Sequence, residues 1–124
     1  MNYPKYIVGI EEMNNEINEN LDKVILLIFT ASWCGPCKKL KSELEKGLYE
    51  KYKDQAIVLY IDVDQEQNQE LMEIYEVTAM PTQVFIKTDL DKEKNKVFIN
   101  KLTEILGCDM IKLRMKFEEY CQKS

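Results

Sequence analysis

Hydrophobic and polar residues follow one another in blocks along the chain, and the apolar blocks predict five strands. Two uninterrupted apolar runs, Val24–Thr30 and Ala56–Asp62, have the length of strands and the composition typical of central strands covered on both faces. A short β-branched segment, Tyr6–Ile10, predicts an edge strand. Two further strands are expected over Gln83–Lys87 and from Lys96 towards Ile105.

Four helices are predicted where apolar residues recur every three to four positions. They cover Glu11–Leu21, Cys34–Tyr52, Gln67–Tyr75 and a last segment that follows Asp109, a good N-cap, and ends near Gln122. The residues expected to face the core from these helices are Met13, Ile17, Leu21, Cys37, Leu40, Leu44, Leu48, Leu71, Ile74, Tyr75, Met110, Leu113, Phe117 and Cys121.

The order of these elements is β-α-β-α-β-α-β-β-α, which predicts an α/β sandwich. Strand–helix–strand units at the front imply parallel strands, and the last two strands form an antiparallel pair. A charged segment, Thr88–Asn95, is expected to form the tip of that hairpin as a solvated loop. With 124 residues and no linker or repeat, the chain is expected to form one domain over residues 1–124.

Composition and charge exclude several classes of function. The chain is 45% hydrophobic and 31% charged, with a net charge of −5 and no basic cluster, so nucleic-acid binding is not expected. No apolar run approaches the length that spans a membrane. The first residues show neither a long apolar segment nor a small-residue cleavage site, which predicts no signal peptide. The expected compartment is therefore reducing and cytoplasmic.

Two cysteines, Cys34 and Cys37, are separated by two residues where a predicted strand gives way to a helix. A zinc site is disfavoured because the chain has no His and because Cys108 and Cys121 lie thirteen positions apart. A structural disulfide is also disfavoured, since closing so short a loop stabilises weakly and a reducing compartment would open it. A redox-active pair remains the favoured interpretation.

The predicted helix start explains how such a pair would work. Unpaired backbone N–H groups and the helix dipole stabilise a thiolate on Cys34, and the thiolate is the nucleophile of disulfide exchange. Cys37 lies one turn further, on the inward stripe, where it can attack the sulfur of Cys34. Pro36 is pre-set for a first helical turn, and Gly35 leaves room for a substrate chain.

The segment WCGPCK, Trp33–Lys38, closely resembles the active site of thioredoxins, and MPT, Met80–Thr82, resembles their loop with a cis-proline. The resemblance implies a thioredoxin fold, a mixed sheet with helices on both faces. It implies that Cys34 attacks, that Cys37 resolves and that Trp33 flanks the site. Pro81 would be the cis-proline, and Gly107 resembles the glycine at the end of the substrate groove.

The sequence also departs from the family. Thioredoxins usually carry a buried Asp six residues before the first cysteine and a Lys on the next strand, where this chain has Ile28 and Tyr60. Losing both partners avoids an uncompensated buried charge. Without the acid, slower resolution of the mixed disulfide is expected. The hairpin after Pro81 is longer than in thioredoxins, and Cys108, beside Gly107, is a candidate regulatory thiol.

The resemblance implies a protein-disulfide reductase that acts through the dithiol, needs no cofactor or metal, and takes electrons from a thioredoxin-reductase-like enzyme. Its partners would be disulfide-containing client proteins, and a monomer is expected. A disulfide oxidase or isomerase is the first alternative, disfavoured because such relatives typically carry a His between the cysteines. A redox-independent binding module is the second alternative.

Overall fold

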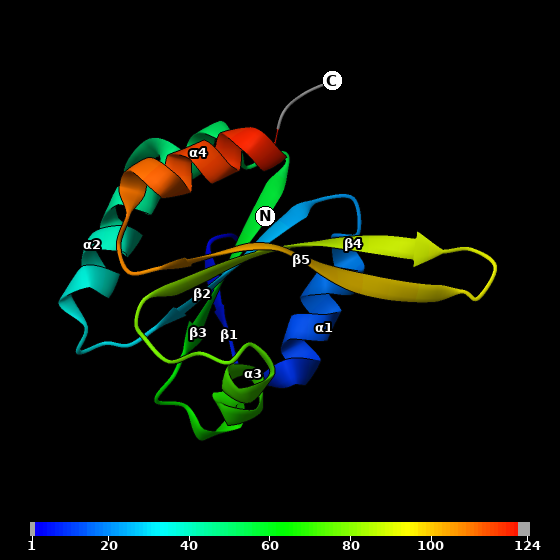
Figure 1. Cartoon of the computed structure of the whole chain (residues 1–124), viewed down its shortest axis with the longest axis horizontal. Helices are drawn as coiled ribbons and strands as arrows, with labels where there is room; N and C mark the ends of the chain where they lie inside the picture. Colours follow the sequence, from blue (N-terminus) through cyan, green and yellow to red (C-terminus); the bar gives the residue numbers. More distant parts are fainter. Residues whose placement is uncertain (1, 122–124) are drawn as a thin grey trace.

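The computed structural model describes residues 2–121. Its centre is a five-stranded sheet in the order β1-β3-β2-β4-β5 (Figure 1). The strands are β1 (Lys5–Ile7), β2 (Val24–Thr30), β3 (Ala56–Asp62), β4 (Thr82–Asp91) and β5 (Lys96–Leu106). Strands β1, β3 and β2 pair in parallel, whereas β4 pairs antiparallel with both β2 and β5. The predicted element order and the predicted mixed sheet are confirmed.

Four α-helices cover the sheet: α1 (Gly9–Glu19), α2 (Gly35–Glu43), α3 (Gln69–Ile74) and α4 (Met110–Tyr120). A 3-10 turn, Glu66–Asn68, precedes α3. Beyond α2 the chain continues in helical turns over Leu44–Leu48 and Tyr49–Lys51, with an extended φ of 174° at Gly47. The predicted end of α4 near Gln122 lies outside the described residues.

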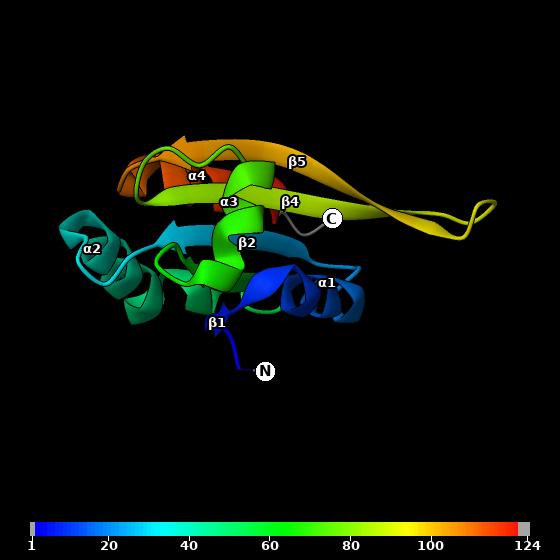
Figure 2. The ribbon, with the colours of Figure 1, turned by 90° about the horizontal axis from the view of Figure 1, so that it is seen from below.

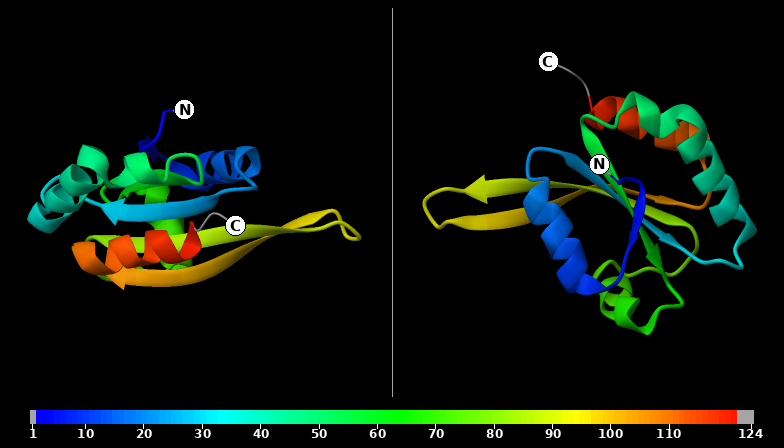
Figure 3. Two further views of the ribbon diagram at one scale, coloured as in Figure 1. Left: turned by 90° about the horizontal axis from the view of Figure 1, so that it is seen from above. Right: turned by 180° about the vertical axis from the view of Figure 1, so that it is seen from behind.

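Alternating side chains of β2 divide the core into two layers. Ile25, Leu27 and Phe29 pack with residues of α1 and α3 on one face of the sheet. Leu26 and Ile28 pack with residues of α2 and α4 on the other face. Figure 2 and Figure 3 show the sheet between these two helical layers. All seven residues of β2 are buried, as expected of a central strand covered on both sides.

Some predicted boundaries and core positions are wrong. The first strand ends at Ile7 instead of Ile10, because the chain turns at Gly9, with a φ of +83°, directly into α1. Leu21 is exposed since α1 ends at Glu19 and no longer directs that residue inward. Ile74 is also exposed, at the end of the short helix α3.

The expected hairpin tip is wrong in a larger respect. Pairing between β4 and β5 continues to Asp91 and Lys96, so the first half of the predicted loop, 88–91, is strand. The two strands project beyond the helices as a twisted ribbon (Figures 1 and 2). The chain reverses within the four residues between the strands, where Asn95 has a φ of +52°.

Candidate redox site

The two cysteines lie where β2 ends and α2 begins. Cys34 is the N-cap of α2, and its sulfur accepts a hydrogen bond from the backbone N–H of Cys37 at 3.2 Å. Pro36 stands in the first turn of α2, where no intrahelical N–H bond is required. This end of the helix supplies both a backbone donor and the positive end of the dipole to Cys34.

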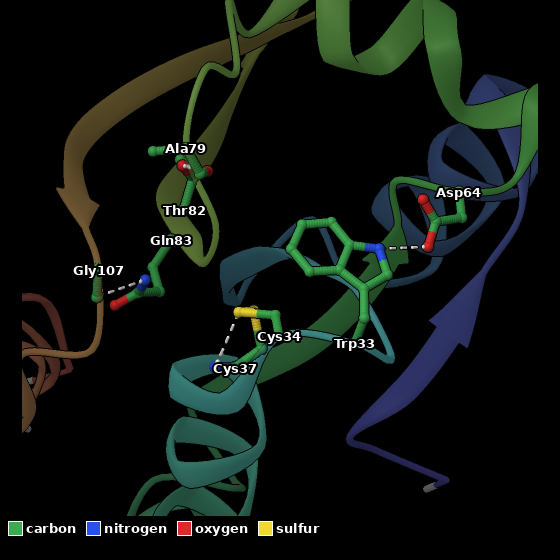
Figure 4. The surroundings of a disulfide bond; sticks show 8 residues. All are labelled: Trp33, Cys34, Cys37, Asp64, Ala79, Thr82, Gln83 and Gly107. Atoms are coloured by element: carbon green, nitrogen blue, oxygen red, sulfur yellow. Dashed lines mark hydrogen bonds between the residues drawn. A yellow bond between two sulfur atoms is a disulfide. The ribbon is translucent and has the colours of Figure 1, made fainter.

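Cys34 and Cys37 form a disulfide, with their Cα atoms 5.2 Å apart (Figure 4). In this form both residues are nearly buried, with exposed fractions of 5% and 3%. The exposed fraction therefore does not distinguish the roles of the two cysteines. Their positions on α2 do, since Cys34 caps the helix and Cys37 lies within its first turn. Cys37 begins the inward stripe that continues through Leu40, Leu44 and Leu48, all buried as predicted.

Trp33 lies beside the disulfide at the surface, with 67% of its area exposed. Its Nε1 donates a hydrogen bond to Oδ2 of Asp64 at 2.9 Å, which fixes the indole ring (Figure 4). Asp64 follows β3, and its own N–H donates to Asp62 at 2.9 Å. Sequence reasoning missed Asp64. The available signal was its place after a strand parallel to β2, because the carboxyl ends of parallel neighbours meet at one edge of the sheet.

Thr82, at the start of β4, lies across from the disulfide (Figure 4), and the Met80–Pro81 bond just before it is cis, as the resemblance implies. The Thr82 hydroxyl donates to the carbonyl of Ala79 at 2.7 Å. The N–H of Gly107 donates to the carbonyl of Pro81 at 2.8 Å. Gly107 has a φ of +79°, a conformation that favours glycine, so the backbone itself joins this loop to the end of β5.

One row of side chains crosses the sheet beneath this site. Ile28 on β2 lies opposite Tyr60 on β3 and opposite Gln83 on β4, and Gln83 lies opposite Ile105 on β5. All four are at most 2% exposed, and none carries a carboxylate. The buried acid that thioredoxins place in this row is therefore absent here.

Tyr60 uses its hydroxyl away from the disulfide. The hydroxyl donates to Oε2 of Glu45, in the turns after α2, at 2.5 Å. Burial and this hydrogen bond to a carboxylate both raise the pKa of Tyr60. The ammonium group of Lys41 lies over the Tyr60 ring, 5.4 Å from its centre. Tyr60 therefore stays a neutral phenol that ties β3 to the surface of the protein.

Gln83 is the second residue that sequence reasoning missed. Its Nε2 donates to the carbonyl of Gly107 at 3.1 Å, and its Oε1 is buried without a hydrogen-bond partner among the described residues. A polar residue within an apolar strand was the available signal, because a buried amide requires partners.

The two remaining cysteines carry free thiols in different surroundings. Cys108, next to Gly107, is partly buried at the start of the α4 layer. Cys121 is buried at the end of α4, and burial raises the pKa of its thiol to about 11.

Within residues 2–121, no group of three or more His, Cys, Asp or Glu side chains is placed to hold a metal ion. In the same residues, no helix has the length and apolar character needed to cross a membrane.

Fold and site together define an α/β protein that carries a dithiol/disulfide pair at the N-terminus of a helix. Comparison with known proteins assigns the family. The Thioredoxin family model matches residues 6–106, and the chain belongs to this family.

Similar proteins come from several animals. Thioredoxin-1 of Drosophila melanogaster is 52% identical over 66 residues, which is 53% of this chain and 59% of that protein. The crystal structure of the D. melanogaster germline-specific thioredoxin Deadhead superposes with a TM-score of 0.74 at 35% identity, covering 92% of this chain and 96% of that one. Thioredoxin of Fasciola hepatica superposes with a TM-score of 0.75 at 31% identity, covering 94% and 98%. The sequence match thus spans about three-fifths of the fruit-fly relative, and the structural matches span nearly whole chains.

Proposed function

We propose that this protein is a thiol–disulfide oxidoreductase that reduces disulfides of client proteins. The Cys34 thiolate attacks one sulfur of a client disulfide, and the other client sulfur leaves as a thiolate. The Cys37 thiolate then attacks the Cys34 sulfur of the mixed disulfide and releases the second client thiolate. The client gains two electrons, and the protein ends as the observed Cys34–Cys37 disulfide.

A single observation carries this assignment: Cys34 caps α2 and its sulfur accepts the N–H of Cys37. A thiolate in that place is stabilised by a hydrogen bond and by the helix dipole before any client arrives. Cys37 is held one turn away, close enough to bond with Cys34. The same geometry supports both steps of the exchange and gives each cysteine its role.

The surroundings of the disulfide support a protein as the substrate. Trp33 offers a large exposed apolar surface on one side, and Thr82 lies on the other side (Figure 4). Met80 and Pro81 directly precede Thr82, and the Pro81 carbonyl accepts a hydrogen bond from Gly107. An exposed aromatic ring beside a reactive group is typical of a contact surface for another chain. These residues are proposed to contact the client around its disulfide.

The direction of electron flow is proposed from the residues between the cysteines. Gly35 and Pro36 lie between the cysteines, where the oxidase and isomerase relatives of thioredoxins typically carry a His. Reduction of clients is therefore favoured over disulfide formation, with electrons supplied by a thioredoxin-reductase-like enzyme and no bound cofactor. A cytoplasmic location and a monomeric state complete the proposal, since a reducing compartment keeps the dithiol available.

Reduction of insulin by dithiothreitol, followed by turbidity, tests this proposal. The wild-type protein should accelerate the reaction, and Cys34→Ala should abolish the acceleration. Cys37→Ala should accumulate a mixed disulfide with the client, visible as an added mass without reductant. Cys121→Ala, which changes a buried thiol outside the site, should react like wild type. If Cys34→Ala remains as active as wild type, the proposed function is wrong.

A further inference from the structure

The side chain of Gln83 holds the backbone of Gly107, the residue that directly follows β5 (Figure 4). Its Nε2 donates to the Gly107 carbonyl at 3.1 Å, and the Gly107 N–H donates to the Pro81 carbonyl at 2.8 Å. Gln83 lies opposite Ile105, and a long side chain can cover the diagonal step to the residue two positions further on. Both backbone polar groups of Gly107 are therefore bonded to residues at the start of β4.

The Gln83 amide makes this bond at a cost. Only the nitrogen of an amide can donate to a carbonyl, so the bond to Gly107 fixes which way the amide is turned. Oε1 is then buried without a hydrogen-bond partner among residues 2–121, and Gln83 itself is 0% exposed. An apolar residue would avoid that cost, as the neighbours Ile28 and Ile105 do. Stability alone therefore does not explain a glutamine at this position.

The backbone of Gly107 is open to an approaching chain. A Cβ placed on Gly107 would meet no heavy atom of the described chain within 4 Å, its chain neighbours aside. Glycine is thus required by its φ of +79° and not by a lack of room. Gly107 is bonded to Pro81, and the next residue, Thr82, lies across from the disulfide. A client chain bound beside Thr82 can therefore lie close to the Gly107 backbone.

We propose that Gln83 is a positioning residue for client binding, because its amide fixes Gly107 beside Pro81 and Thr82 before a client arrives. The bond from the Gly107 N–H is a backbone bond and does not depend on the side chain at position 83. The bond to the Gly107 carbonyl does depend on it. Without that bond, the client has to order the Gly107 backbone as it binds, which weakens binding. The inference rests on the proposed function and adds a residue that touches neither the client nor the cysteines.

Reaction of the reduced protein with two different disulfides tests the proposal. Insulin is a protein client, whereas hydroxyethyl disulfide is a small molecule without a peptide chain to place beside Gly107. In both reactions the Cys34–Cys37 dithiol is oxidised to its disulfide and two electrons pass to the added disulfide, and Trp33 fluorescence follows the change. Gln83→Met keeps an unbranched side chain of similar length but lacks the amide. Its second-order rate constant should fall about two- to tenfold for insulin, the range of one net hydrogen bond, and stay unchanged for hydroxyethyl disulfide.

Urea unfolding provides a readout that distinguishes positioning from a stabilising bond. Gln83→Met removes the unpaired Oε1, and it leaves a carbonyl on Gly107, which is only partly buried and can bond to water. The free energy of unfolding should therefore stay equal or rise, although the reaction with insulin is slower. Gln83→Leu, a second apolar replacement, should show the same combination.

Thr88→Val is the matched control. Thr88 is buried towards the far end of the same strand, and its hydroxyl donates to the carbonyl of Leu21 at 2.9 Å. This variant also loses one side-chain bond to a backbone carbonyl, but away from the redox site. It should lower the free energy of unfolding and leave both rate constants unchanged.

The outcomes separate this proposal from the proposed function. A wild-type protein that does not reduce insulin would overturn both. If the wild type reduces insulin and both Gln83 variants do so at the same rate, only the role of Gln83 is overturned, and its amide is a structural contact to Gly107. Equal losses of rate with insulin and with hydroxyethyl disulfide would also overturn it, since the substitution would then act on the dithiol and not on client binding.

Discussion

Returning an acid to the row beneath the disulfide should accelerate the second step of exchange. Ile28 is the position for this change, since it is 1% exposed and lies between Tyr60 and Gln83. As Cys37 attacks the mixed disulfide it must lose its proton, and in this row no carboxylate is present to receive it. The Ile28→Asp substitution supplies such a base on β2, the strand that leads to the two cysteines, at the position where thioredoxins usually carry their buried Asp.

The structure sets a large cost for that substitution alone. Removing the buried isoleucine side chain loses roughly 2–3 kcal/mol, and an unpaired buried carboxylate costs about 3–5 kcal/mol more. The sum is comparable to the whole stability of a typical domain, about 5–15 kcal/mol. Burial raises the pKa of the new carboxyl above its unfolded value of about 3.9, so stability should fall as pH rises through the interval between the two values.

Adding Tyr60→Lys should restore much of this loss. Tyr60 is the direct neighbour of Ile28 on β3, and its hydroxyl already reaches the carboxylate of Glu45 at 2.5 Å. A lysine at position 60 would meet the carboxylate introduced at position 28 and the Glu45 carboxylate at the surface. The Ile28→Asp/Tyr60→Lys variant is therefore the form in which to measure the rate.

Stopped-flow mixing of the reduced protein with a saturating small disulfide isolates the resolving step, and the fluorescence of the single Trp33 follows it. The double variant should resolve on the order of 10²-fold faster than Ile28→Asn/Tyr60→Lys, which has a similar shape and no base. Equal rates in these two variants would show that proton removal from Cys37 does not limit resolution. The reasoning about the missing acid would then be refuted.

Three further predictions rest on separate contacts. At pH 8, a thiol reagent should label Cys108 much faster than Cys121, whose pKa is raised to about 11 by burial. Equal labelling rates would show that Cys108 is no more accessible than Cys121. Asp109→Ala removes the side-chain cap of α4 and should lower the free energy of unfolding by about 1 kcal/mol in urea titrations. Burial opposes ionisation of Glu16, but its ion pair with Lys5 prevails and lowers its pKa, so this pair stabilises the fold above about pH 4.5 and is lost as pH falls. In the Glu16→Gln variant, the free energy of unfolding should therefore decrease less steeply as the pH falls below about 4.5.

Long apolar stretches and helical stripes could be read directly from the sequence. Val24–Thr30 and Ala56–Asp62 match β2 and β3 residue for residue, because a strand buried on both faces needs an unbroken apolar run. The ends of elements were harder to predict. Charged residues in Thr88–Asn95 suggested a loop, yet pairing between β4 and β5 continues there, since cross-strand hydrogen bonds do not require apolar side chains.

At the site, the sequence was enough to identify the two reactive cysteines. It was not enough to identify the residues that contact their surroundings. The motif around Cys34 and Cys37 implied a disulfide pair at a helix start, and the structure contains it. Asp64 accepts a hydrogen bond from Trp33 across two strands, 31 positions away in the sequence, and Gln83 donates one to Gly107 from β4 to the end of β5. Only the register between strands reveals such contacts, and register depends on the packing of the whole sheet.

The row beneath the disulfide shows how one substitution changes the demands on its neighbours. With an apolar residue at position 28, a lysine on β3 would have no carboxylate partner within the row, and Tyr60 avoids a buried charge by remaining a neutral phenol that bonds to Glu45 at the surface. The buried side-chain atom left without a hydrogen-bond partner among the described residues lies in the same row, on β4, at Oε1 of Gln83. Because Ile28 and Gln83 lie opposite each other, the effects of Ile28→Asp and Gln83→Met on the free energy of unfolding should not add, and additive effects would mean that these two side chains do not interact.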